Sequence, residues 1–406
     1  MKNKLIKLMM LVVGCFIGMT GDGQTAYITN TNGNNVSVID VGTNTVITTI
    51  PVGIFPYGVS VSHDGTKVFV TNSGNRRVSV INAFTNTVSN TITVNQVSNG
   101  ICVSPDGTKV FVASSVSDTL LVINTATNSV SDTIIVGYDP FGICFSPNGS
   151  KAYVSNIQSS TVSVINALTD TIISTIHVGY QPYGISITPD GSKVYVANSM
   201  DNTISVINTT SDTVLATIAI GISPFGVSAS PDGSKVFVTN NQSRNVSVIN
   251  TATNTILDSI NIGYCLLGIS ISPDGSKVCV VAECDNKVFV INTSTLTVID
   301  SITVGNFPVS FGNFISSFGT GIPSITPSTP SITIYPNPTN SILNIKAQLG
   351  IRNYELGISD VLGNEVYHET LIGIDNSIGI TAWNAGIYFY EIRSEHGSER
   401  GKFVKE

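Results

Sequence analysis

Apolar and polar residues alternate in short runs along residues 24–317, and the whole pattern repeats every 42 residues. In the unit that begins at Pro182, the β-branched or alternating runs are Gly184–Thr188, Val194–Val196, Ile204–Ile207 and Thr213–Ile218. Alternation with a period of two, without a 3.6-residue period, favours strands over helices. Each unit is therefore predicted to contain four short β-strands joined by turns.

Tight turns mark the same place in six consecutive units. The pairs are Asp64-Gly65, Asp106-Gly107, Asn148-Gly149, Asp190-Gly191, Asp232-Gly233 and Asp274-Gly275. Asp tolerates a positive φ and Gly prefers it, so the repetition indicates turn geometry rather than a metal site. A lysine follows each turn, and these six lysines are expected to form a solvated rim. They are Lys67, Lys109, Lys151, Lys193, Lys235 and Lys277.

A repeated four-stranded unit of this length is typical of a β-propeller. Six units are complete, a seventh first strand begins near Ser310, and three further strands lie at residues 26–30, 36–40 and 45–50. We therefore predict a seven-bladed propeller over residues 24–317. Its first three strands and its last strand would complete a shared blade, which removes exposed sheet edges.

Residues 1–23 have the pattern of a secretory signal peptide, with basic Lys2, Lys4 and Lys7, an apolar run over residues 8–19 and a cleavage site near Gln24. The box that ends at Cys15 leaves lipoprotein processing as an alternative. Either route exports the chain, and disulfides are then permitted. No transmembrane segment is expected, because no later apolar run approaches the roughly 18 residues that a membrane helix requires.

The C-terminal part of the chain loses the 42-residue period. Residues 318–331 are rich in Pro, Ser, Thr and Gly and are predicted to be a linker. Strand-like runs then occur at residues 332–335, 342–347, 354–358, 365–370 and 386–393. Residues 332–406 are predicted to form a small Ig-like β-sandwich.

One strand of the repeat carries a recurring four-residue motif. It reads Tyr27-Ile28-Thr29-Asn30, Phe69-Val70-Thr71-Asn72, Tyr153-Val154-Ser155-Asn156, Tyr195-Val196-Ala197-Asn198 and Phe237-Val238-Thr239-Asn240. The motif resembles the YVTN family of β-propeller repeats, which occur in secreted and cell-surface microbial proteins. The resemblance implies seven blades but no single activity. Ser114 and Ala282 depart from it, in the second and sixth units.

The tail has four landmarks in order. They are Tyr335-Pro336-Asn337-Pro338, Asp360-Val361-Leu362-Gly363, Ala385-Gly386-Ile387-Tyr388 and Lys402-Phe403-Val404-Lys405. Together they resemble the type A sorting domain of the type IX secretion system. The resemblance implies a Bacteroidetes-type bacterium, a partnership with the type IX machinery, export across the outer membrane, and then surface anchoring or release. Its sorting residues would be Pro336, Asn337, Pro338, Gly363, Gly386, Tyr388, Lys402 and Lys405. An ordinary carbohydrate-binding sandwich is the alternative.

The amino-acid composition and the motifs of the chain argue against several classes of function. Only 11% of the 406 residues are charged and the net charge is −7, so a nucleic-acid partner is not expected. Neither His63 nor His177 has a partner at metal-ligand spacing, and neither a nucleophile elbow nor a phosphate loop is found. We therefore predict no catalytic residues, no metal and no cofactor.

Positions that vary while the frame repeats are better candidates for binding. In a propeller, the loops from fourth to first strands and from second to third strands share one face. The candidate residues there are Tyr57, Arg76, Arg77, Asp118, Tyr138, Phe141, Gln158, Tyr180, Tyr183, Met200, Asp201, Phe225, Gln242, Arg244, Tyr264, Glu283 and Asp285. Aromatic rings beside a polar rim suit sugars or peptides. The inner residues Tyr57, Phe141, Tyr183 and Phe225 are also explained by packing between blades.

The cysteines divide into two groups. Cys265 and Cys284 lie in the two same-face loops of the sixth unit, where a disulfide is predicted, with free buried thiols as the alternative. Cys102 and Cys144 occupy equivalent first-strand positions that other units fill with Ser, and Cys279 replaces a core aromatic residue.

These features predict a secreted or surface-anchored propeller that acts as a binding scaffold for an unknown protein or polysaccharide. A lactonase-like or quinoprotein-like enzyme and a surface-layer component are the alternatives.

Overall fold

The chain was analysed as a computed structural model. The structure describes residues 24–316, 332–335, 338–347, 353–360, 364–373, 375–394 and 397–406. The predicted signal peptide and the predicted linker lie outside the described residues. Contacts divide the chain into two units, Met1–Ile322 and Pro323–Glu406.

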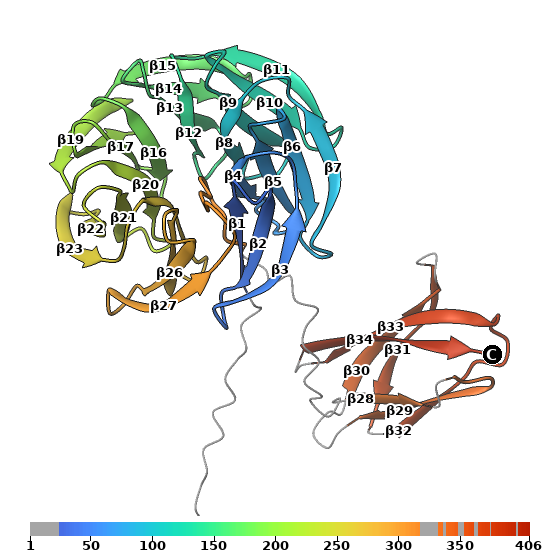
Figure 1. Cartoon of the computed structure of the whole chain (residues 1–406). Helices are drawn as coiled ribbons and strands as arrows, with labels where there is room; N and C mark the ends of the chain where they lie inside the picture. The colour runs from blue at the N-terminus through green and yellow to red at the C-terminus, as the bar shows by residue number, and fades with distance from the viewer. Residues whose placement is uncertain are drawn as a thin grey trace, which may run out of the picture. The chain divides into compact units, whose positions relative to one another are not determined.

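Six four-stranded antiparallel sheets, blades 1 to 6, stand around a common centre in the first unit (Figure 1). Blades 1 to 3 are β4 (Pro56–Val61), β5 (Lys67–Asn72), β6 (Arg77–Asn82) and β7 (Thr87–Thr93); β8 (Ser98–Val103), β9 (Lys109–Ser114), β10 (Thr119–Asn124) and β11 (Ser129–Ile135); and β12 (Pro140–Phe145), β13 (Lys151–Asn156), β14 (Thr161–Asn166) and β15 (Thr171–His177). Blades 4 to 6 are β16 (Pro182–Ile187), β17 (Lys193–Asn198), β18 (Thr203–Asn208) and β19 (Thr213–Ala219); β20 (Pro224–Ala229), β21 (Lys235–Asn240), β22 (Asn245–Asn250) and β23 (Thr255–Asn261); and β24 (Leu266–Ile271), β25 (Lys277–Ala282), β26 (Lys287–Asn292) and β27 (Thr297–Thr303).

The two ends of the propeller share the seventh blade. Strands β1 (Thr25–Asn30), β2 (Asn35–Asp40) and β3 (Thr45–Pro51) form a three-stranded sheet. Residues 308–316 take the fourth place, because the Tyr27 N–H donates to the Phe314 carbonyl at 2.9 Å and the Ser316 N–H donates to the Thr25 carbonyl at 2.8 Å. The predicted seven-bladed ring is confirmed. This closure leaves no free sheet edge at the junction.

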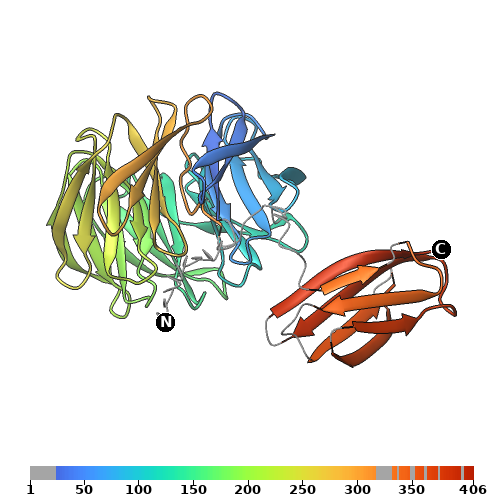
Figure 2. The ribbon, with the colours of Figure 1, turned by 90° about the horizontal axis from the view of Figure 1, so that it is seen from below.

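Burial falls from the inner strands to the outer ones. Strand β5 is almost wholly buried, whereas β7 buries one residue, Ile92. First strands of neighbouring blades approach so closely that a Cβ on Gly100 would lie 1.7 Å from the Phe141 carbonyl oxygen. Glycine is therefore required where adjacent blades meet at the centre. Seen from the side, the strand ends gather at two opposite faces of the ring (Figure 2).

The prediction of a solvated lysine rim is wrong for several lysines, because their side chains reach the next blade. The Lys109 ammonium pairs with the Asp170 carboxylate at 2.8 Å, and Lys151 pairs with Asp212 at 2.9 Å. The Lys193 ammonium also donates to an oxygen of the next blade, the Thr251 carbonyl. Each partner lies about 60 residues further along the chain, so a single repeat does not reveal it.

The second unit is a small β domain with two sheets. One contains β28 (Ile332–Tyr335), β29 (Ile342–Ala347) and β32 (Asp375–Gly379), and the other contains β31 (Glu365–Ile372), β30 (Asn353–Ser359), β33 (Gly386–Ser394) and β34 (Gly397–Lys405). Leu343, Leu356 and Phe403 are among its buried core residues. Strands β32 and β34 were not among the predicted runs, because their sequences are mostly polar and their pairing partners decide their conformation.

The described residues contain no helix long and apolar enough to cross a membrane.

Candidate binding face

Two sets of loops meet on one side of the propeller, which we call the loop face. The Tyr138 N–H, in the loop between blades 2 and 3, donates to the Ser159 hydroxyl of the second-to-third-strand loop of blade 3 at 2.7 Å. The same pairing of loops occurs in blade 4, where the Tyr180 N–H donates to the Asp201 carboxylate at 2.7 Å. The Asp-Gly turns lie at the other ends of the strands, on what we call the turn face. Because neighbouring loops are hydrogen-bonded to one another in this way, their backbones hold fixed positions on the loop face.

The inner aromatic residues pack on one another across the centre of the ring. The Phe141 ring lies 5.8 Å from Tyr57, 5.1 Å from Tyr183, 5.9 Å from Phe225 and 4.7 Å from Phe311, measured between centroids. We call these five rings the aromatic plug. Phe141 is buried within it, so it is not available to a ligand, whereas Tyr57, Tyr183 and Phe225 keep one side partly exposed.

Acidic groups lie near the aromatic plug. Burial raises the pKa of the Tyr57 hydroxyl, and the nearby Glu283 carboxylate raises it further. Burial likewise raises the pKa of Glu283 itself. The pKa of Asp139 is raised by burial and, to a smaller extent, by the charge of Asp118. Burial therefore opposes the ionised form of Glu283 and of Asp139.

A hollow of about 450 Å³ opens on the loop face between blades 4 and 5, and we call it the loop hollow. Its lining is Gln181, Tyr183, Ser199, Met200, Asn202, Ile222, Ser223, Phe225, Asn241, Gln242 and Leu267. Every lining side chain is uncharged at neutral pH. Within the described part of the chain, the side-chain amides of Gln181 and Gln242 make no hydrogen bond, so they are available to a ligand.

Four of the predicted binding residues, namely Tyr183, Met200, Phe225 and Gln242, line this hollow together. Sequence reasoning missed Gln181, Asn202 and the other polar lining residues, although they lie in the same loops as the predicted ones. Gln181 directly precedes Pro182, which begins a strand. The residue before this proline varies from unit to unit, and that variation was the sequence signal that could have identified Gln181.

Arg244 and Tyr264 are also brought together. The guanidinium carbon lies 3.8 Å from the centroid of the tyrosine ring, a cation–π contact. Arg244 has a φ of 61°, as the last residue of its loop. Blade 4 places Asn202 at the same point, where the asparagine oxygen accepts the Ser223 N–H at 2.8 Å. The turn therefore does not require an arginine at the position of Arg244.

The remaining predicted residues are spread around the loop face rather than gathered at one point. Asp118 and Asp201 accept backbone N–H groups of the adjoining loops, so they brace those loops. Tyr138 and Tyr180 are exposed by 66% and 67%. The other members of this set are Arg76, Arg77, Gln158, Glu283 and Asp285.

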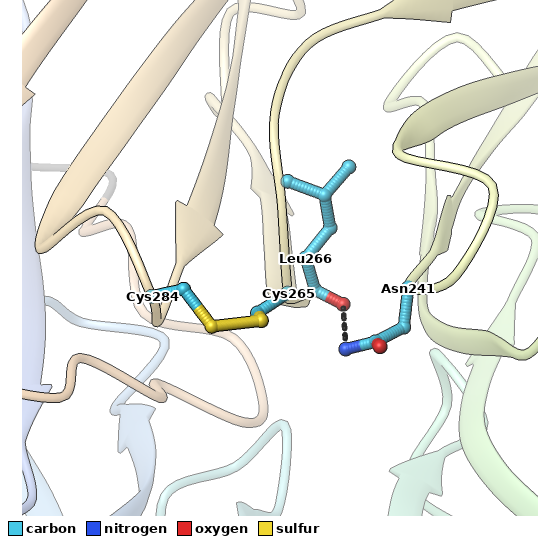
Figure 3. Close-up of a disulfide and its surroundings, with 4 residues drawn as sticks. All are labelled: Asn241, Cys265, Leu266 and Cys284. Atoms are coloured by element: carbon cyan, nitrogen blue, oxygen red, sulfur yellow. Dashed lines mark hydrogen bonds between the residues drawn. A yellow bond between two sulfur atoms is a disulfide. The ribbon is translucent and has the colours of Figure 1, made fainter.

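Cys265 and Cys284 are joined by a disulfide on the loop face, with their Cα atoms 5.6 Å apart (Figure 3). The bond ties the loop before β24 to the loop after β25. Beside it, the Asn241 side chain donates to the Leu266 carbonyl at 3.2 Å and connects blade 5 to the same loop. A Glu283 carboxylate oxygen lies within 4.8 Å of both sulfurs, but the sulfurs are bonded to each other and are not thiolate ligands.

The predicted sorting residues that the structure describes lie on or beside the last two strands. Gly386 pairs with Lys405 at one end of the β33–β34 ladder, and Lys402 pairs with Phe389. Tyr388 is buried and stacks on Phe403, with 5.6 Å between ring centroids. Pro338 is exposed. Pro336, Asn337 and Gly363 lie outside the described residues.

Comparison with solved structures supports the fold. Residues of the propeller are similar to Kuenenia stuttgartiensis hydrazine synthase, with 22% identity over 68% of this chain and 94% of that chain and a TM-score of 0.63. A functionally unknown protein from Desulfotomaculum acetoxidans DSM 771 matches with 19% identity over 71% and 99% of the two chains and a TM-score of 0.62. At these identities the likeness shows the fold alone. No curated protein matches the chain.

Two protein families match separate parts of the chain. The YNCE-like β-propeller family matches residues 60–154 and 148–246, and the secretion system C-terminal sorting domain matches residues 333–406. The sorting domain indicates secretion to the cell surface or the extracellular space. Residues 60–246 therefore belong to a propeller with YNCE-like repeats of the YVTN type, and residues 333–406 are a type IX secretion system C-terminal sorting domain.

Proposed function

We propose that this secreted propeller is a binding module whose loop hollow holds a neutral carbohydrate chain. The observation that carries the proposal is the lining, in which free amides of Gln181 and Gln242 stand beside the aromatic rings of Tyr183 and Phe225. Sugars combine hydroxyl groups with apolar ring faces, so amides and aromatic rings together suit them.

Charge favours a neutral ligand over an ionic one. The lining of the hollow provides no ammonium or guanidinium group to pair with an acidic sugar or a phosphate. A buried ionic group without a partner would weaken binding, whereas neutral hydroxyls can be satisfied by the amides.

The proposal is tested by applying the full chain to an array of neutral, acidic and basic glycans, and then by calorimetry with the neutral glycan that binds best. Gln181→Ala and Gln242→Ala are each expected to weaken binding about tenfold, which corresponds to about 1.4 kcal/mol. Thr210→Ala, an exposed turn-face residue, is the matched control and should bind as the parent does. Failure to bind any neutral glycan, or equal affinity in all three variants, would reject the proposal.

A further inference from the structure

A second cavity lies on the axis of the ring, on the turn-face side of the aromatic plug. It has a volume of about 540 Å³ and is lined by the first strands of the blades. Phe311 belongs both to its lining and to the aromatic plug, so the plug closes its inner end. We call it the channel cavity. It is separate from the loop hollow, which lies beyond the plug on the opposite face.

The polar groups that line the channel cavity are largely engaged in holding the blades together. The Ser60 hydroxyl accepts the Val103 N–H at 3.1 Å, and Ser186 accepts the Ala229 N–H at 3.1 Å. Each of these bonds crosses from one blade to the next. The surface that remains available to a ligand is mainly aliphatic, and it comes from Ile143, Ile185, Val227 and Ile269.

Two neighbouring blades place a thiol where four others place a hydroxyl. Cys102 on β8 and Cys144 on β12 both line the cavity, at the position of Ser60 and Ser186. Burial raises the pKa of Cys102 to about 12, and it raises that of Cys144 well above its ordinary value. Both thiols are therefore neutral, and sulfur makes favourable contacts with aromatic rings.

The lining has no Asp, Glu, Lys or Arg side chain, and His63 is its one imidazole. A charged ligand would lose its hydration without gaining a counter-ion. An apolar ligand instead gains roughly 25 cal/mol for each Å² that it removes from water. The volume falls within the range of roughly 300–1,000 Å³ that is usual for small-molecule sites.

We propose that the channel cavity binds a small uncharged molecule built on an aromatic or alicyclic ring. The ligand enters from the turn face, lies against the Ile143 and Ile185 side chains, and places its ring beside the thiols of Cys102 and Cys144. This site is independent of the carbohydrate role proposed for the loop hollow.

The test uses the full chain and two fluorescent probes, neutral Nile red and the anionic 1-anilinonaphthalene-8-sulfonate. Nile red should bind saturably with one site per chain, and the anionic probe should bind at least tenfold more weakly. Cys144→Phe, which fills the cavity, should weaken Nile red binding at least tenfold. Met200→Ala, in the loop hollow, should leave it unchanged.

Labelling guards against a folding defect in Cys144→Phe. Benzyl methanethiosulfonate transfers a benzylthio group to a thiol and releases methanesulfinate. Its attachment to Cys102 or Cys144, verified by peptide mapping, should abolish Nile red binding. The variant Cys102→Ser/Cys144→Ser restores the hydroxyls of the other blades and should bind Nile red even after the same treatment. Absence of Nile red binding, equal binding of both probes, or undiminished binding after labelling at these two residues would overturn the proposal.

Discussion

The Asn72 side chain accepts a hydrogen bond from the Gly53 N–H at 3.0 Å, and a Cβ on Gly53 would lie 2.6 Å from the Asn72 side chain. The same asparagine donates to the Ser79 hydroxyl at 3.0 Å. The last residue of the YVTN motif therefore clamps a loop of the loop face to its own blade. In this blade the motif has a structural role that requires both the amide and the glycine.

Loss of the clamp should be destabilising. Asn72→Ala leaves the Gly53 N–H without its partner in a half-buried loop, and we expect a loss of about 1–3 kcal/mol in the free energy of unfolding. Chemical denaturation measures it. Asn90→Ala, which removes an exposed asparagine from outer strand β7, is the control and should change the stability by less than about 0.5 kcal/mol. Equal effects in the two variants would contradict the clamp.

Blade 6 should depend on its disulfide, because its motif lacks the asparagine that donates to a third-strand serine in blades 1 and 5. Ala282 occupies the asparagine position there, and the Phe289 ring fills the adjoining space, 3.2 Å from where a Cβ of Gly263 would be. Cys265→Ser/Cys284→Ser should lower the free energy of unfolding by about 3 kcal/mol, since the bond closes a loop of 19 residues.

Restoring the asparagine and its serine partner should recover part of that loss. In the chain without the disulfide, Ala282→Asn/Phe289→Ser recreates the asparagine and serine of blades 1 and 5, and chemical denaturation compares the two chains. An unchanged midpoint would show that the disulfide does not stand in for the amide.

A leucine takes the place of the polar partner of one rim lysine, and an inter-blade ion pair can be added there. Leu296 occupies the position at which Asp170 and Asp212 pair with lysines, and its φ of 55° is unfavourable for leucine. Leu296→Asp should relieve the backbone strain and face Lys235, raising the stability by about 1–2 kcal/mol. Thermal unfolding measures the gain. Leu296→Asn separates the two causes, because it relieves strain without charge. The difference between the two variants should shrink in high salt.

The turn carboxylates should make the propeller sensitive to acid. Hydrogen bonds from the Ser230 hydroxyl, the Ser234 N–H and the Ser234 hydroxyl lower the pKa of Asp232 to about 2. A lowered folded-state pKa contributes stability above the unfolded-state pKa, and that contribution is lost as the pH falls through the folded-state value. Stability should therefore decline between about pH 4 and pH 2.

Asp232→Asn tests this pH dependence. Asn148 fills the same turn position in blade 3 and accepts the Ser146 hydroxyl at 2.8 Å, so the variant keeps the turn geometry. Its stability at pH 7 should be lower than that of the parent, because the contribution of the carboxylate is lost, and its decline in acid should be shallower. Denaturation midpoints measured from pH 2 to pH 7 check both statements. A parallel decline in the two chains would contradict the assignment.

The sequence by itself determined the number of blades, the closure and the sorting tail. Strand alternation and Asp-Gly turns are local features, and their 42-residue repetition specifies the ring before any contact is known. The repeat stops after a seventh first strand near Ser310, and the three strands within residues 26–50 have no first strand of their own. These two observations were sufficient to predict the shared blade.

The tertiary structure alone decided what the candidate residues do. Phe141 looks like an exposed loop aromatic in the repeat, yet it is buried because five blades direct their rings to one axis. Lys109 looks solvated, yet it pairs with Asp170 because the twist of adjacent blades brings that turn to it. The loop hollow and the channel cavity likewise arise where several blades converge. A single repeat determines the strands and turns of one blade. Contacts between blades depend on the offset between neighbouring blades, which no single unit encodes.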